Sequence, residues 1–227
     1  MKRAIQPPGG SFKRAGVIAG LVLCAACAQV AMMSVTPMIA ALASHLDQRS
    51  ASEILELEKK QDWPGMLKLA RVRLQREPGR AEWWFLQGYA LARQEQHAAA
   101  IESYQQAIRI SPEEEATWLA LGRSQSALGQ TERAIQTYRQ ALRYRPESAA
   151  AYLDLADLYL QQGRPDLAIP NYRENVRYEP DSSLGWYGLA AAYQSTGQRE
   201  RRDEALQGLR KLDPGAADQF EKQYLSK

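Results

Sequence analysis

The sequence predicts an all-α protein in which one apolar N-terminal segment precedes a stack of helical hairpins. Three observations support this fold class. Prolines recur every 34 residues, aromatic and small residues recur with the same period, and apolar residues inside each period follow helical spacing. The prolines are Pro78, Pro112, Pro146, Pro180 and Pro214. At 227 residues and 45% hydrophobic content, the chain is long and apolar enough to bury a core.

Residues 1–14 are predicted to form a basic cytoplasmic tail. Four basic residues precede Asp47, the first acidic residue of the chain. They are Lys2, Arg3, Lys13 and Arg14. The formal net charge of +3 therefore reflects the N-terminal end alone. The rest of the chain lacks the basic excess of a nucleic-acid-binding protein, so no nucleic-acid partner is expected.

Residues 15–43 are predicted to form a single transmembrane helix or an uncleaved signal anchor. The 30 residues from Ala15 to Ser44 carry no formal charge, and about 20 apolar residues suffice to cross a bilayer. Pro37 is expected to kink or end the helix near Thr36. Basic residues before the segment favour a cytoplasmic N-terminus. We therefore expect a single-pass protein of the bacterial inner membrane, with all later residues in the periplasm.

Two alternatives remain for this segment. Ala41-Leu42-Ala43 resembles a signal-peptidase site, so the segment could be cleaved before Ser44. A lipoprotein could instead be processed at Cys24 or Cys27, although Leu23 is too large for the usual signal. The two cysteines form a C-x-x-C pattern without the following histidine of a haem-attachment site. Inside an apolar run they are expected to behave as small hydrophobic residues.

Four repeated units are predicted over residues 81–216, after a degenerate first unit and linker at 44–80. The unit boundaries are 81–114, 115–148, 149–182 and 183–216. In the second unit Trp118, Leu121 and Gly122 follow helical spacing, Gly129 ends that helix, and a second apolar face runs to Pro146. Each unit is therefore a hairpin in which aromatic side chains are expected to pack against Gly or Ala. Residues 217–227 are expected to form a capping helix over the last exposed face.

These spacings resemble the tetratricopeptide repeat (TPR) family. The family pattern W-x2-L-G-x2-Y, A-x3-F/Y, A and P is matched closely by the second unit. The matching residues are Trp118, Leu121, Gly122, Ala134, Tyr138, Ala141 and Pro146. The degenerate unit has Ser50 where the family places an aromatic residue. Other departures are Arg202 and Asn175, where Ala is usual, and Pro170 inside a second helix. Pro170 is expected to distort its own turn, which bears on the packing between the third and fourth units.

The sequence offers few residues for catalysis. The only two histidines, His45 and His97, are isolated, and neither a phosphate-binding loop nor a G-x-S-x-G motif is present. We therefore predict that the chain is not an enzyme and has no cofactor, metal ion or small-molecule substrate.

The resemblance implies that the first helices of the units line a concave groove that binds an extended or helical peptide. Read onto this chain, the groove positions of the family give Phe85, Tyr89, Arg93, Leu119, Arg123, Leu153, Asp157, Leu160, Tyr187 and Gln194. Phe85 and Tyr89 stand where some members carry a Lys/Asn clamp for C-terminal carboxylates, so binding of that kind is disfavoured.

The expected function is that of a membrane-anchored, periplasm-facing TPR scaffold or adaptor. It would bind protein partners, such as membrane-complex subunits or an extended peptide segment, during assembly of an envelope or membrane complex. One alternative is a secreted or lipid-anchored periplasmic TPR adaptor. Another is a non-catalytic accessory subunit of a membrane enzyme complex, since similar architectures occur in cytochrome c maturation, pilus and polysaccharide systems.

Overall fold

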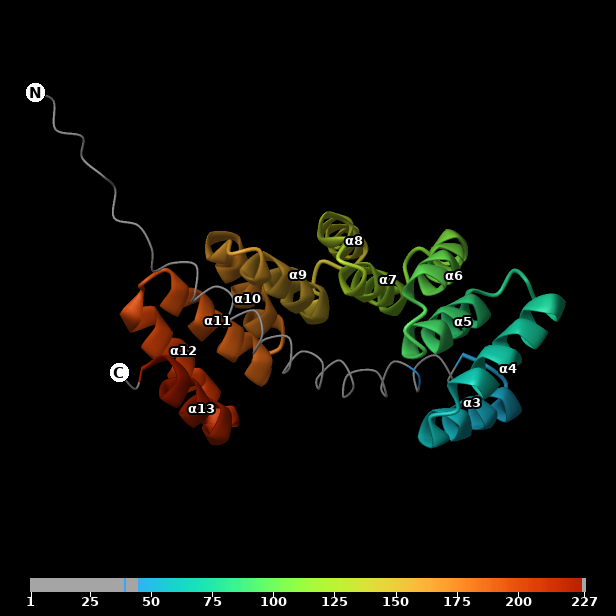
Figure 1. The fold of residues 1–227 in the computed structure, drawn as a ribbon, viewed down its shortest axis with the longest axis horizontal. Helices are drawn as coiled ribbons and strands as arrows, with labels where there is room; N and C mark the ends of the chain where they lie inside the picture. Colours follow the sequence, from blue (N-terminus) through green and yellow to red (C-terminus); the bar gives the residue numbers. More distant parts are fainter. Residues whose placement is uncertain (1–38, 40–44, 226–227) are drawn as a thin grey trace, which may run out of the picture.

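The protein is an all-α solenoid in the computed structural model, which describes Ile39 and residues 45–225. Eleven helices and no strands occur within these residues. They are α3 (Gln48–Lys60), α4 (Trp63–Arg76), α5 (Ala81–Arg93), α6 (His97–Ile110), α7 (Glu115–Ala127), α8 (Thr131–Tyr144), α9 (Ala149–Gln161), α10 (Pro165–Tyr178), α11 (Ser183–Ser195), α12 (Arg199–Leu212) and α13 (Pro214–Tyr224). Figure 1 shows the hairpins stacked along the long axis, with α3 and α13 near opposite ends. The predicted fold class is confirmed for this part of the chain.

The evenly spaced prolines lie at the corners between successive hairpins. Pro78 follows α4, Pro112 follows α6, and Pro146 and Pro180 occupy the same place after α8 and α10. Pro214 instead starts α13, directly after α12. Proline cannot continue the preceding helix, and its fixed φ suits the first turn of the next one.

Aromatic side chains of the second helices fill space that glycines leave open on the first helices. A Cβ atom at Gly88 would lie 2.7 Å from Tyr104 Cε1, and one at Gly122 would lie 2.5 Å from Tyr138 Cε1. Tyr104 and Tyr138 are buried. The predicted packing of large against small residues is therefore present in these hairpins.

The third unit achieves the same packing with a different partner. Its buried Tyr172 lies against Gly188 of the following unit, where a Cβ atom would lie 2.2 Å from Tyr172 Cε1. Tyr172 thereby joins α10 to α11.

Pro170, which is expected to distort its turn, lies inside α10 without ending the helix. The helix is continuous from Pro165 to Tyr178, and one hydrophobic core extends from the second unit to the capping helix. Proline here removes only the hydrogen bond to the carbonyl of Asp166, which is an exposed residue. The Asn171 side chain donates to the Leu167 carbonyl at 2.8 Å, which satisfies a neighbouring backbone acceptor.

The degenerate first unit is also a helical hairpin, formed by α3 and α4. Ser50, which replaces the usual aromatic residue, is buried. Its hydroxyl donates to Asp47 Oδ2 at 2.7 Å and accepts from Arg73 Nη2 at 2.8 Å. Hydrogen bonds therefore replace the aromatic packing at this one position, while Ile54 and Met66 keep the core of the hairpin apolar.

The turns inside the hairpins share one left-handed backbone position. Gly129, Gly163 and Gly197 have φ values of 70°, 70° and 72°. Glu95 and Gln61 occupy the same repeat position with φ values of 59° and 53°. A side chain in this conformation costs about 1 kcal/mol relative to glycine.

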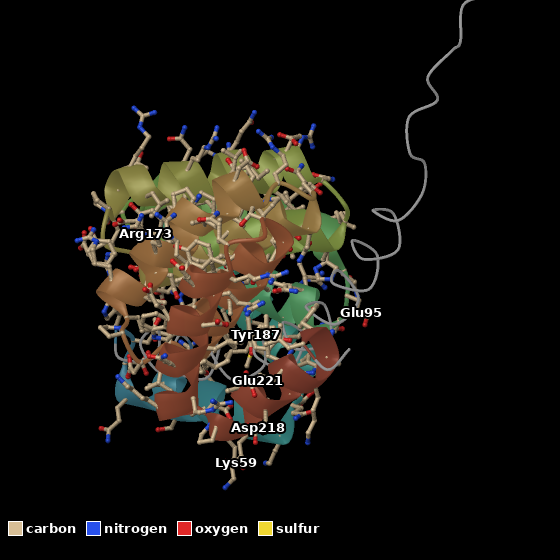
Figure 2. All side chains as sticks on the ribbon, turned by 90° about the vertical axis from the view of Figure 1, so that its left-hand side faces the viewer. Lys59, Glu95, Arg173, Tyr187, Asp218 and Glu221 are labelled. Atoms are coloured by element: carbon tan, nitrogen blue, oxygen red, sulfur yellow. The ribbon has the colours of Figure 1, made fainter. Side chains whose placement is uncertain are left out.

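Glu95→Gly is therefore expected to raise the free energy of unfolding by about 1 kcal/mol, because it removes this strain from the exposed turn labelled in Figure 2. Urea unfolding followed by circular dichroism measures the change. Gly129→Ala, at the matching turn, should lower stability by a similar amount. Equal stability of Glu95→Gly and the unchanged protein would contradict the assigned strain.

The predicted membrane segment lies outside the described residues, except for Ile39. None of the helices in the part of the chain that the structure describes is long and apolar enough to span a bilayer. Ile39 has no exposed surface and belongs to the same core cluster as Ile54 and Met66.

Candidate functional site

The predicted groove residues lie on four first helices, which together form what we call the first-helix surface. Phe85, Tyr89 and Arg93 come from α5; Leu119 and Arg123 from α7; Leu153, Asp157 and Leu160 from α9; and Tyr187 and Gln194 from α11. Successive first helices are equivalent elements of the stack, so the repeat places these residues in register along it.

Three of these residues are buried and have packing roles. Phe85, Tyr89 and Leu119 are 2%, 3% and 7% exposed. The Phe85 ring lies 5.7 Å from that of Tyr104 and stacks on Tyr89 at 6.4 Å. These side chains support the surface from beneath and offer little area for a partner.

A polar and aromatic cluster forms the α3–α5 end of the surface. The Tyr89 hydroxyl donates to Glu58 Oε1 at 2.8 Å, and the Arg93 guanidinium lies over the Trp63 ring at 4.3 Å. Burial, followed by the interaction with Glu58, raises the pKa of Tyr89, which keeps its hydroxyl protonated as a donor. Glu58 and Trp63 were missed by the sequence analysis because the degenerate unit has no clear family register.

An ion pair between neighbouring first helices forms the centre of the surface. Arg123 Nε donates to Asp154 Oδ2 at 2.8 Å, and the two side chains are 29% and 17% exposed. The charge of Asp154 raises the pKa of the Arg123 guanidinium. Burial, followed by the charge of Asp154, raises the pKa of Tyr138 well above its ordinary value.

Asp154 is a second residue that the sequence analysis missed. It lies 31 residues after Arg123, three short of the repeat period. That spacing places the two residues close together on adjacent first helices, which could have identified the pair.

The α9 part of the surface combines a hydrogen-bonded carboxylate with apolar side chains. Asp157 accepts a hydrogen bond from the Tyr172 hydroxyl. Leu153 and Leu160 are partly buried and pack against the core cluster.

The capping helix covers the α11 end of the surface. The Tyr187 ring makes an edge contact with Phe220 of α13 at 5.4 Å. Burial and Tyr224 raise the pKa of Tyr187 to about 12. Figure 2 shows Tyr187 close to this end of the stack, together with Asp218 and Glu221 of α13.

Gln194 also has a partner within the fold. Its Oε1 accepts from Arg202 Nη1 at 2.7 Å. Arg202, which replaces the usual alanine, therefore links α12 to α11.

The chemistry of this surface suits contact with another molecule. Its central charges are already paired with each other, the Tyr89 hydroxyl donates to Glu58, and Asp157 accepts from Tyr172 of α10. Within residues 45–225 and Ile39, no group of three or more His, Cys, Asp or Glu side chains could hold a metal ion.

The fold defines a helical-repeat protein. Tetratricopeptide repeat models match the chain, one at residues 119–175 and 153–217 and a second at residues 91–141. Together these matches span residues 91–217, more than half of the chain. The chain therefore belongs to the tetratricopeptide repeat family, whose members act as protein-binding scaffolds.

Several solved structures share the fold. The crystal structure of MamA is similar with 21% identity and a TM-score of 0.61, covering 74% of this chain and 94% of that one. YrrB, described as a TPR protein with an unusual peptide-binding site, has 18% identity and a TM-score of 0.60 over 73% of this chain and 87% of its own. TTC0263 from Thermus thermophilus has 19% identity and a TM-score of 0.57, covering 76% and 93%. No curated protein sequence matches this chain.

Proposed function

We propose that this chain is a membrane-anchored scaffold whose repeat domain faces the periplasm and binds a protein partner during assembly of a membrane or envelope complex. The observation that carries the binding role is the partly exposed ion pair between Arg123 and Asp154 on the first-helix surface. Because the fold already holds these two charged side chains in place, binding a partner costs little additional side-chain conformational entropy.

The anchoring role is supported by the uncharged N-terminal sequence. The charge-free run begins at Ala15, after four basic residues, which favours a cytoplasmic N-terminus. In this proposal the membrane-crossing part ends before Ile39, which is buried in a core cluster with Ile54 and Met66. Residues 15–38 still exceed the length of about 20 residues that a spanning helix needs.

A peptide or a folded surface with charges of both signs fits the first-helix surface best. Arg123 and Asp154 present opposite charges side by side, while Leu153 and Leu160 add partly exposed apolar area. The unusual peptide-binding site described for YrrB, a protein with the same fold, is consistent with this use of a TPR surface.

Exchanging the two charges tests the binding role. In the double variant Arg123→Asp, Asp154→Arg the internal ion pair is retained, but the charges presented to a partner are reversed. We expect unfolding close to that of the unchanged protein and at least about a tenfold loss of partner capture in detergent pulldowns quantified by mass spectrometry. Its matched control exchanges the exposed pair Glu56 and Lys60 on α3, which are 3.0 Å apart.

Two outcomes would count against the proposal. If the Arg123/Asp154 exchange captures the same partners at the yield of the Glu56/Lys60 control, the first-helix surface does not bind them. If mass spectrometry of the mature protein finds Ser44 as the first residue, the segment is cleaved and does not anchor the chain. An acyl group on Cys24 or Cys27 would replace the transmembrane anchor with a lipid.

A further inference from the structure

A second surface, which is hollowed, lies between the second helices α10 and α12. A cleft of about 360 Å³ opens there, and α11 forms its floor. It adjoins a cleft of about 270 Å³ through Trp186 and Glu204, and one of about 370 Å³ through Arg201. The three clefts follow α12 from its first turn to its last, and we call them the α12 trough. The 14 residues of α12 give the trough a length of about 20 Å.

The rim of the α12 trough is mainly basic, although Glu200 and Glu204 also line it. Arg173 and Arg201 line the central cleft, and Lys211 lines the cleft at the C-terminal end of α12. All three side chains are exposed and make no ion pair with any described residue. Arg201 is held by a hydrogen bond to Gln198 Oε1 at 2.8 Å, which orients it without neutralising it. Figure 2 shows Arg173 toward the margin of the molecule.

The floor of the trough is apolar. Val176, Trp186 and Leu189 line the central cleft, and Leu212, which is 41% exposed, lines the next. Trp186 can lie close to α12 because position 208 is glycine; a Cβ atom there would lie 2.7 Å from the indole. The indole Nε1 already donates to the Pro180 carbonyl at 2.9 Å, so the ring offers mainly apolar area.

We propose that the α12 trough binds an acidic peptide segment that carries apolar anchor residues. The unpaired cations of the rim complement carboxylates on the peptide, and the floor takes up its apolar side chains. This surface is separate from the first-helix surface, so a second partner segment could be held at the same time.

A nucleic acid fits the trough less well than a peptide. Glu204 lies in the middle of the trough and belongs to two of its clefts, where it would repel a continuous phosphate backbone. An acidic peptide can place an apolar residue at that point and its carboxylates on either side.

Fluorescence anisotropy with the full chain in neutral detergent tests the proposal. The probe is a fluorescein-labelled peptide of about 12 residues, in which two leucines and one phenylalanine are spaced among aspartates and glutamates. We expect saturable binding that weakens with salt, and at least about a tenfold loss of affinity in Arg173→Glu, Arg201→Glu. The same peptide with lysines in place of its acidic residues should not bind.

Matched controls come from earlier repeats. Arg133→Glu, Arg143→Glu changes two exposed arginines outside the trough, and Arg133 donates to Gln130 just as Arg201 donates to Gln198. Leu212→Ser should weaken binding severalfold, whereas Ile110→Ser, at the equivalent repeat position and 40% exposed, should not.

The controls also define the results that overturn the proposal. Equal affinities of the Arg173/Arg201 variant and the Arg133/Arg143 control would exclude the α12 trough as the site. Tighter binding of a single-stranded oligonucleotide than of the peptide would indicate a polyanion site instead. An unchanged affinity in Leu212→Ser would show that this apolar side chain does not contribute to binding. The proposal that the trough takes up apolar anchor residues of the peptide would then be wrong.

Discussion

Tyr138→Ala is expected to lower the free energy of unfolding by about 3–5 kcal/mol, among the largest effects for a single residue of this chain. The side chain is 2% exposed and lies at the centre of the stack, against Gly122. Removing it leaves a cavity beside a glycine that cannot fill the space. Urea unfolding of the full chain in detergent, followed by circular dichroism at 222 nm, measures the change.

Tyr144→Ala is the matched control on the same helix. Tyr144 is 52% exposed and stacks on Trp118 at 5.7 Å. Its removal should cost less than about 1 kcal/mol. If both variants unfold at the same urea concentration, Tyr138 does not hold the stack together as its burial indicates.

The all-α hairpin architecture could be predicted because each repeat carries the same signals. Proline at the corners, glycine in the turns and aromatic residues opposite small ones act locally, so a single sequence reveals them by their period. The effect of Pro170 could not be predicted in this way. Whether a proline breaks a helix depends on the partners of the freed carbonyl and on tertiary packing, and neither has a fixed sequence spacing.

The candidate surface was less predictable than the fold. Family positions identified Arg123 but not Asp154, because the pair joins two units and the periodic pattern describes each unit alone. The same family positions also identified Phe85 and Leu119, which are buried. Each first helix has one side on the surface and another packed against neighbouring helices, and these two residues lie on the packed side. Exposure depends on the exact rotation of each helix in the stack, which the repeat pattern does not specify.

The second large effect is expected at the junction of the third and fourth units, where Asn175 faces Gly185. Asn175 is fully buried, and its Nδ2 donates to the Ala149 carbonyl at 3.0 Å. A Cβ atom at Gly185 would lie 1.8 Å from Asn175 Oδ1 and 2.9 Å from Val176 Cγ1. The Asn175 side chain cannot rotate away from position 185 without breaking its hydrogen bond to the Ala149 carbonyl. Gly185→Ala should therefore lower the free energy of unfolding by about 2–3 kcal/mol.

The sign of this effect should reverse once Asn175 is removed. In an Asn175→Ala background the 1.8 Å contact is gone, and the remaining close atom, Val176 Cγ1 at 2.9 Å, is a terminal methyl group that needs to shift by only a few tenths of an ångström. Alanine is favoured over glycine within a helix by about 0.5–1 kcal/mol. Gly185→Ala should then stabilise the protein, which gives a coupling energy of about 3 kcal/mol in a double-mutant cycle. Gly79→Ala serves as the control, since no atom lies within 4 Å of a Cβ at that position. Additive effects of the two substitutions would show that Asn175 and Gly185 do not contact each other, and the glycine would then need another explanation. A reversal of sign would show instead that Asn175, which stands where the family usually has alanine, fits into the stack because the next helix carries glycine at position 185.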